Sequence, residues 1–115
     1  MLLGRDDIDP DIPDCNGRTP LWDAAENGHR EVVKMLIGRG DVNPGKPDIY
    51  GKTPLLCAAA SGQEGVVKIL LGRGDVNPDK PDMHGQTPFF CATSRGHAGV
   101  VTLLQLRVSA APSTA

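Results

Sequence analysis

The chain has 115 residues, which fits one structural unit, and only 3% of them are aromatic, too few for a conventional single core. Its formal net charge of -2 argues against binding to nucleic acid or to a membrane surface, which needs a basic stripe. No apolar stretch is long enough to span a membrane, and the apolar run at the N-terminus is too short for a signal-peptide core. We therefore expect the protein in the cytoplasm or the nucleus.

The sequence repeats itself at an offset of 34 residues. Residues 1–16 match the end of one copy, residues 17–50 and 51–84 are two whole copies, and residues 85–107 are a third copy without its last loop. We expect residues 108–115, which are mostly small and polar, to form a flexible tail. Such a period is typical of a solenoid, in which each unit buries its apolar surface only against its neighbours.

Each copy opens with a Thr-Pro pair, at residues 19–20, 53–54 and 87–88. The threonine hydroxyl can cap a helix, and proline is well tolerated at the first helical position. We therefore expect a first helix of about two turns after each pair, ended by a glycine. These glycines recur in every copy as Gly28, Gly62 and Gly96.

A second helix is expected at about residues 30–37 of the first copy. Its apolar residues surround a lone Lys34, so we expect neighbours to cover this helix on most sides. The loop that follows carries one apolar residue, Val42 in the first copy and Val76 in the second, which we expect to be buried. Prolines in this loop remove backbone donors, so we expect no regular β-hairpin ladder there.

In this order and spacing, the elements Thr-Pro-Leu, Ala-Ala, Gly-His, Val-Val-Lys and Asp-Val-Asn resemble the ankyrin repeat over about residues 2–106. The resemblance implies an all-α solenoid of stacked antiparallel helix pairs with projecting finger loops. It also implies that a protein partner binds on the concave face made by the fingertips and the first helices. The period exceeds the common form of about 33 residues. We assign the difference to a longer finger, similar to that of large ankyrin arrays common in filamentous fungi.

One slot departs from the family pattern. Ankyrin repeats usually carry a histidine after Thr-Pro-Leu, which bonds across repeats, whereas this chain has Trp22, Leu56 and Phe90 there. We expect apolar packing to replace that polar ladder.

The positions that differ between the copies predict the binding surface, because residues needed for capping, packing and turning stay the same. They gather at the fingertips and on the first helices, the slots that the resemblance implies for partner contact. Ile49, Tyr50 and Met83 suit interface anchors better than bare surface, although drift at unconstrained sites is the alternative. The predicted partner-binding residues are Arg18, Ile49, Tyr50, Lys52, Ala60, Ser61, Met83, His84, Gln86, Ser94 and Arg95. The acidic first finger, from Asp6 to Asp14, also favours a basic patch on the partner.

Three functions remain open from the sequence. The first is a protein–protein interaction module, one segment of a longer array, and the second is a structural spacer with no ligand of its own. The third is an enzyme, which we disfavour because no nucleophile, base and orienting group can be assembled. We therefore expect no catalytic residues, no cofactor, no metal site and no small-molecule substrate.

Two short motifs are better explained by the repeat than by chemistry. Residues 40–46 fit the first seven positions of a P-loop, but Pro47 stands where magnesium needs a Ser or Thr hydroxyl. Arg-Gly-Asp occurs at residues 39–41 and 73–75, where we expect the end of a helix and the start of a finger.

The three cysteines Cys15, Cys57 and Cys91 are expected to be free thiols. Cys57 and Cys91 occupy the same slot of neighbouring copies, and adjacent helices pack about 8–10 Å apart, which exceeds the reach of a disulfide.

Overall fold

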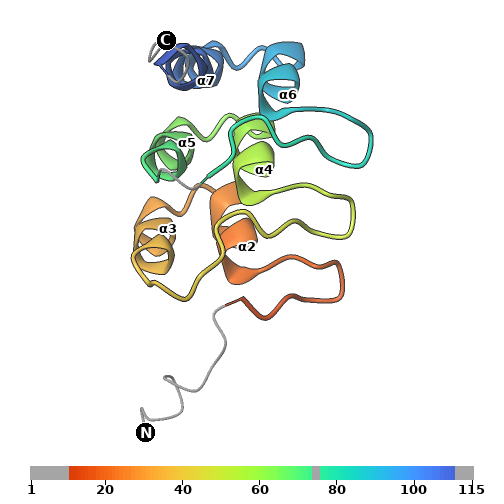
Figure 1. Cartoon of the computed structure of the whole chain (residues 1–115), viewed down its shortest axis with the longest axis vertical. Coiled ribbons are helices and arrows are strands. Elements are labelled where there is room, and N and C mark those ends of the chain that lie inside the picture. Colours follow the sequence, from red (N-terminus) through yellow and green to blue (C-terminus); the bar gives the residue numbers. More distant parts are fainter. Residues whose placement is uncertain (1–10, 74–75, 111–115) are drawn as a thin grey trace, which may run out of the picture.

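The computed structural model describes residues 11–73 and 76–110 of the chain. The described part contains no strand and is built from three helix pairs stacked side by side (Figure 1). The helices are α2 (Pro20–Glu26), α3 (Arg30–Ile37), α4 (Pro54–Ala60), α5 (Glu64–Leu71), α6 (Pro88–Ser94) and α7 (Ala98–Ala110). The predicted all-α stack of helix pairs is confirmed.

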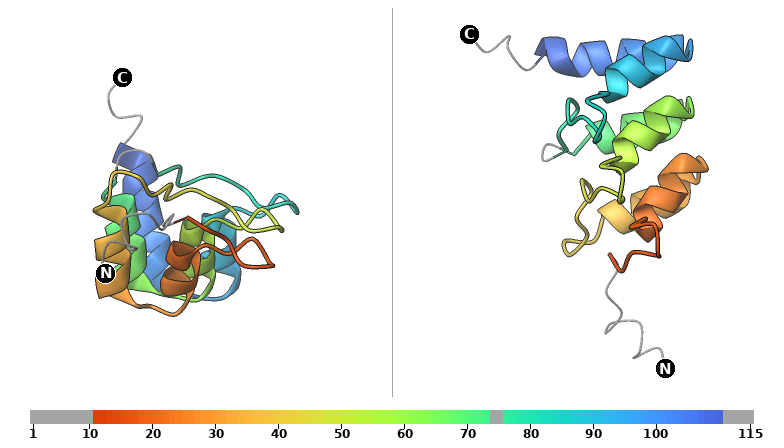
Figure 2. Two further views of the ribbon diagram at one scale, coloured as in Figure 1. Left: turned by 90° about the horizontal axis from the view of Figure 1, so that it is seen from below. Right: turned by 90° about the vertical axis from the view of Figure 1, so that its right-hand side faces the viewer.

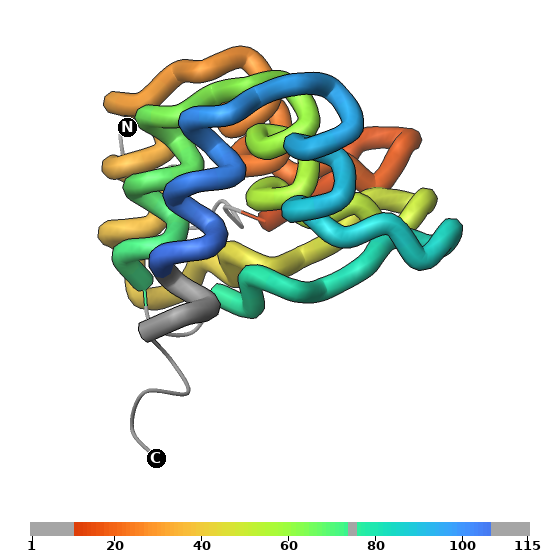
Figure 3. The backbone as a smooth tube through the Cα atoms, turned by 90° about the horizontal axis from the view of Figure 1, so that it is seen from above, coloured from red at the N-terminus to blue at the C-terminus, as the bar shows by residue number. Residues whose placement is uncertain are grey.

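The stack has two layers of helices (Figures 2 and 3). The first helices α2, α4 and α6 pack in one row, and the second helices α3, α5 and α7 pack in the other. The loops before the first helices project beside them, and we call these loops the first finger (residues 11–18), the second finger (residues 38–52) and the third finger (described residues 72–73 and 76–86). The core lies between the two rows of helices and beneath the fingers, where Val42 and Val76 are buried as expected.

Local sequence signals set the start of the first helices. The Thr19 hydroxyl accepts a hydrogen bond from the Trp22 backbone N–H at 3.2 Å, and a proline at the first helical position follows each capping threonine. Thr53 and Thr87 cap α4 and α6 in the same way, with distances of 3.1 Å. The predicted helix starts are therefore confirmed in all three copies.

A left-handed glycine ends each first helix. Gly28 has a φ of 74°, and its N–H donates to Ala25 O while the His29 N–H donates to Ala24 O. This pair of bonds closes the helix and turns the chain toward α3, a conformation that favours glycine because other residues would strain it. Gly62 and Gly96 adopt the same conformation, which confirms the predicted ends.

The second helices are not equally covered, and the expectation of cover on most sides is wrong for α3. Val32 and Met35 are 39% and 66% exposed on α3. In α5, by contrast, Val66 and Leu70 are fully buried. The reason is that α5 packs between α3 and α7, whereas α3 has only one neighbouring second helix among the described residues.

The last helix is longer than the repeat predicts. The sequence predicts a tail from residue 108, but α7 has 13 residues and continues to Ala110, while α5 has 8. Leu106 stands at the position where Gly38 and Gly72 follow the ends of α3 and α5, so the glycine stop is absent. The rest of the expected tail, like Asp6 and the other acidic residues before position 11, lies outside the described residues.

The fingers are held by an aspartate that recurs in each copy. Asp48 Oδ1 accepts hydrogen bonds from the backbone N–H groups of Tyr50 and Lys52, both at 2.9 Å. Asp14 and Asp82 do the same in the first and third fingers. Neighbouring fingers are joined by single backbone bonds, from Ile49 N–H to Asn16 O at 3.0 Å and from Met83 N–H to Tyr50 O at 2.9 Å. As expected, no regular ladder forms in the described parts of the fingers.

Candidate functional site

One hollow of about 180 Å³ lies between the fingers and the first helices. Of the predicted partner-binding residues, those that line it are Arg18, Tyr50, Lys52, Ala60, Ser61, Gln86 and Arg95. These residues come from three copies of the repeat and are far apart in the sequence. The stacking of the copies brings them to one place.

The other predicted residues lie outside the lining. Ile49 and Met83 are exposed at the tips of the second and third fingers, and His84 is exposed beside Met83. Ser94 is exposed at the end of α6, where its hydroxyl donates to Cys91 O at 3.2 Å. The bases of the fingers and the ends of the first helices therefore line the hollow, and Ile49 and Met83 at the fingertips lie outside it.

Trp22 forms part of the hollow and corrects the expectation of purely apolar packing at its slot. Its indole is buried, and Nε1 donates a hydrogen bond to the Lys52 carbonyl of the next copy at 2.9 Å. Leu56 is buried as expected, but Phe90 is 51% exposed, because no described repeat follows it. Of the three residues at this slot, Trp22 thus forms a hydrogen bond to the neighbouring repeat.

Arg18 lies over the Trp22 ring, with its guanidinium carbon 4.4 Å from the ring centroid. This distance is within the range of a cation–π contact. Arg18 Nε is buried and has no hydrogen-bond partner, although the group itself is half-exposed. The guanidinium is therefore held against the indole, and its Nε–H group has no hydrogen-bond acceptor among the described residues.

Sequence reasoning missed Asp48, which also lines the hollow. Asp48 is buried, and its Oδ2 atom has no hydrogen-bond partner, while Oδ1 holds the second finger. The signal that could have found it is the motif Pro-Asp-x-x-Gly, which recurs 34 residues apart around Asp14, Asp48 and Asp82.

Cys57 and Cys91 line the hollow as well, but their thiols are poor nucleophiles. Burial, and then the negative charges of Glu26 and Asp48, raise the pKa of the Cys57 thiol. Burial and the charge of Asp82 raise the pKa of the Cys91 thiol. Because the thiolate is the reactive form, a raised pKa leaves less of it at neutral pH. Within residues 11–73 and 76–110, no three His, Cys, Asp or Glu side chains gather where they could hold a metal ion.

A family model that describes ankyrin repeats in three copies matches residues 1–82 and, again, residues 40–111. The chain belongs to the ankyrin repeat family. Ankyrin repeats are generally protein–protein interaction modules and are typically without enzymatic activity. No curated protein sequence is significantly similar to this chain. None of the helices in the described part is long and apolar enough to cross a membrane.

Hydrogen bonds between neighbouring ankyrin repeats also form at the turns before α5 and α7. Gln63 Nε2 donates to Glu26 O at 3.0 Å, and His97 Nε2 lies 3.0 Å from Ala60 O. Glu26 and Ala60 are the last residues of α2 and α4, so each side chain binds the open end of the preceding first helix. These bonds fix the register between repeats on the same side as the hollow.

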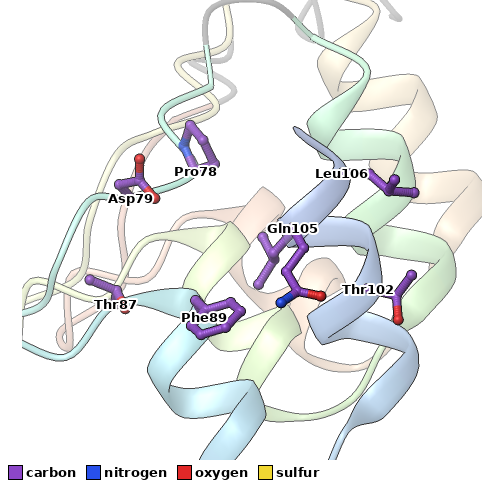
Figure 4. A pocket seen from close by; sticks show the side chains of 8 residues that line it. Pro78, Asp79, Thr87, Phe89, Thr102, Gln105 and Leu106 are labelled. Atoms are coloured by element: carbon purple, nitrogen blue, oxygen red, sulfur yellow. The ribbon is translucent and has the colours of Figure 1, made fainter. Parts of the chain in front are cut away.

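A second, more open hollow of about 680 Å³ lies at the C-terminal end of the ankyrin stack (Figure 4). It lies between α6, α7 and the third finger, and includes Phe89, Leu104 and Leu106. Phe89 is 39% exposed, whereas Leu55 at the same slot is buried under the following pair. None of the predicted partner-binding residues lies there, so this hollow is the uncovered side of the last described repeat.

Proposed function

We propose that this ankyrin stack is an interaction module that binds a protein partner on the concave face made by the fingers and the first helices. The observation that carries the proposal is the convergence on one hollow of residues that differ between the copies. Arg18, Lys52 and Gln86 occupy the same slot in the three fingers, and each carries a different side chain into that hollow. Residues with only a structural role, such as Thr19, are instead the same in every copy.

Tyr50 is the proposed anchor. Its side chain is 44% exposed at the rim of the hollow, and its backbone N–H is held by Asp48 at 2.9 Å. An aromatic side chain offers a large contact area with few rotatable bonds to freeze, so it gains much on binding. Ile49 and Met83 add exposed apolar groups at the tips of the second and third fingers, outside the lining of the hollow.

The alternative is a structural spacer that sets a distance without a ligand. A spacer requires only the capping and packing residues that recur in every copy, and it gives no reason for exposed Ile49, Tyr50 and Met83 on neighbouring fingers. The formal charge of -2 supports a protein partner over nucleic acid or a membrane surface.

Selection from a displayed random-peptide library tests the proposal, with the wild-type chain as bait. Peptides that bind are titrated against Tyr50→Ala, which should weaken binding at least about fivefold, or about 1 kcal/mol, and leave the circular dichroism spectrum unchanged. Lys34→Glu and Lys68→Glu are the matched controls, since both lysines are exposed on second helices. Loss of binding in the lysine variants but not in Tyr50→Ala would place the binding face on the second helices.

A further inference from the structure

Three cations line the hollow, one from each copy of the repeat. They are Arg18 at the base of the first finger, Lys52 at the base of the second finger and Arg95 at the end of α6. None of the three forms an ion pair with a described carboxylate. The ion pairs that the described residues do form, Lys34 with Glu31 and Arg39 with Asp41, lie away from the lining.

We propose that the partner binds this hollow through an acidic, extended segment whose Asp or Glu side chains pair with Arg18, Lys52 and Arg95. This inference rests on the proposed function, because it names the chemistry of the partner for the same face. Positive groups that form no ion pair with a described carboxylate favour a ligand of the opposite sign and disfavour a basic one.

Arg18 is the best-prepared of the three groups. Its guanidinium is stacked on Trp22 at 4.4 Å, and its buried Nε lacks an acceptor. A buried donor without a partner is costly, and a planar guanidinium binds a carboxylate through two parallel hydrogen bonds. Because the stacking already restricts the Arg18 side chain, that side chain loses less conformational entropy when it binds a carboxylate.

The described carboxylates already at the hollow form no ion pair with these three cations. Asp48 is buried and holds the second finger through Oδ1, and Glu26 forms no ion pair with a described residue. Hydrogen bonds from the backbone N–H groups of Arg18 and Asn16 hold Asp14 Oδ1 and lower the pKa of its carboxyl, and the charge of Arg18 contributes less. Glu26 therefore disfavours an acidic segment near the end of α2 and favours a path along the fingers toward α6.

Two carboxylates of the acidic first finger, those of Asp11 and Asp14, are engaged in hydrogen bonds to backbone groups, and the acidic residues before position 11 lie outside the described residues. Asp11 Oδ2 accepts from the Asn43 backbone N–H at 2.8 Å, and Asp14 holds the turn of its own finger. Both carboxylates therefore stabilise the fold by accepting hydrogen bonds from backbone N–H groups.

The spacing of the cations sets the spacing of the acidic residues. Arg18 and Lys52 occupy the same slot of neighbouring repeats, and neighbouring helices pack about 8–10 Å apart. An extended peptide in the polyproline II conformation rises about 3.1 Å per residue and has three residues per turn, so side chains three positions apart lie on the same side. Acidic side chains three positions apart therefore match two neighbouring repeats.

The peptides selected with the wild-type chain test this inference. We expect enrichment of Asp or Glu at two positions three residues apart. The best such peptide is synthesised together with its Gln or Asn counterpart, and both are titrated by following Trp22 fluorescence, which is specific because the chain has one tryptophan. The acidic peptide should bind at least about tenfold more tightly, and the difference should shrink at about 1 M salt.

Charge-neutralising variants complete the test. Lys52→Gln and Arg95→Gln should each weaken binding of the acidic peptide at least about fivefold, and Arg18→Gln should weaken it most. Lys68→Gln is the matched control and should bind as the wild type does. If Arg18→Gln fails to fold, the Lys52 and Arg95 variants still decide the result.

Several outcomes would overturn the inference. Equal binding of the Gln counterpart, tighter binding of a basic peptide, or stronger binding of a phosphopeptide or a single-stranded oligonucleotide would each do so. An equal loss in Lys68→Gln would do so too. Selected peptides that need Tyr50 but carry no acidic residues would overturn the inference and leave the proposed function standing.

Discussion

The indole of Trp22 in the first whole repeat donates a hydrogen bond of 2.9 Å to the carbonyl of Lys52 at the base of the second finger. The bond ties a first helix to the finger of the next repeat, at the slot where the family usually bonds across repeats through histidine. It also brings the backbone of Lys52 against the buried ring on which Arg18 is stacked.

Replacing Trp22 by phenylalanine tests this bond. Trp22→Phe keeps a buried ring but leaves the Lys52 carbonyl without its donor, so we expect a loss of about 1–3 kcal/mol in the free energy of unfolding. Urea titration followed by circular dichroism measures the change. Leu56→Val, at the same slot of the next repeat, removes buried volume without removing a hydrogen bond and serves as a control for lost volume. An unchanged stability in Trp22→Phe would show that the bond contributes nothing.

Two leucines at equivalent positions of the second helices should differ in stability. Leu70 is fully buried between α3 and α7, and Leu36 is half-buried on α3. We expect Leu70→Ala to cost about 2–5 kcal/mol and Leu36→Ala no more than that, because a less enclosed site leaves a smaller cavity. Denaturant unfolding of both variants gives the comparison, with exposed Leu106→Ala as the control. Losses under about 0.5 kcal/mol in both would mean that the inner face of these helices is misassigned.

The finger aspartates should stabilise the fingers through their backbone hydrogen bonds. Asp48→Ala removes an acceptor of two N–H groups, and we expect a loss of about 1–3 kcal/mol. Asp48→Asn keeps an acceptor oxygen and should lose less. Asp79→Ala is the control, since Asp79 is exposed on the third finger. Thermal unfolding of the three variants provides the measurement, and equal stability of Asp48→Ala and Asp79→Ala would contradict this role.

The thiols should differ sharply in reactivity in the folded protein. Burial raises the pKa of Cys57 and of Cys91, so at pH 8 less of each is thiolate than in the unfolded chain, whereas Cys15 is exposed. We expect iodoacetamide to label Cys15 first, and all three cysteines only after denaturation. Peptide mass spectrometry identifies the labelled sites. Labelling of Cys57 as fast as Cys15 under native conditions would show that the hollow opens readily.

Much of the helical framework follows from the sequence because its signals are local. A capping threonine, a proline at the first helical position and a left-handed glycine act within one turn, so Pro20 and Gly28 mark the limits of α2 without reference to distant residues. The second helix of the first copy has the expected bounds, Arg30–Ile37, for the same reason. The longer α7 was also foreseeable, because Leu106 replaces the glycine that follows α3 and α5.

Only the tertiary structure determines which residues are buried and which side chains come together, because both depend on neighbours more than thirty residues away. Val32 and Val66 occupy the same slot, yet one is exposed and the other buried, because only α5 lies between two second helices. The convergence of Arg18, Lys52 and Arg95 on one hollow likewise depends on how the repeats stack. A sequence pattern assigns a residue to a face of its own repeat, but the distance between faces of different repeats is set by packing across the stack.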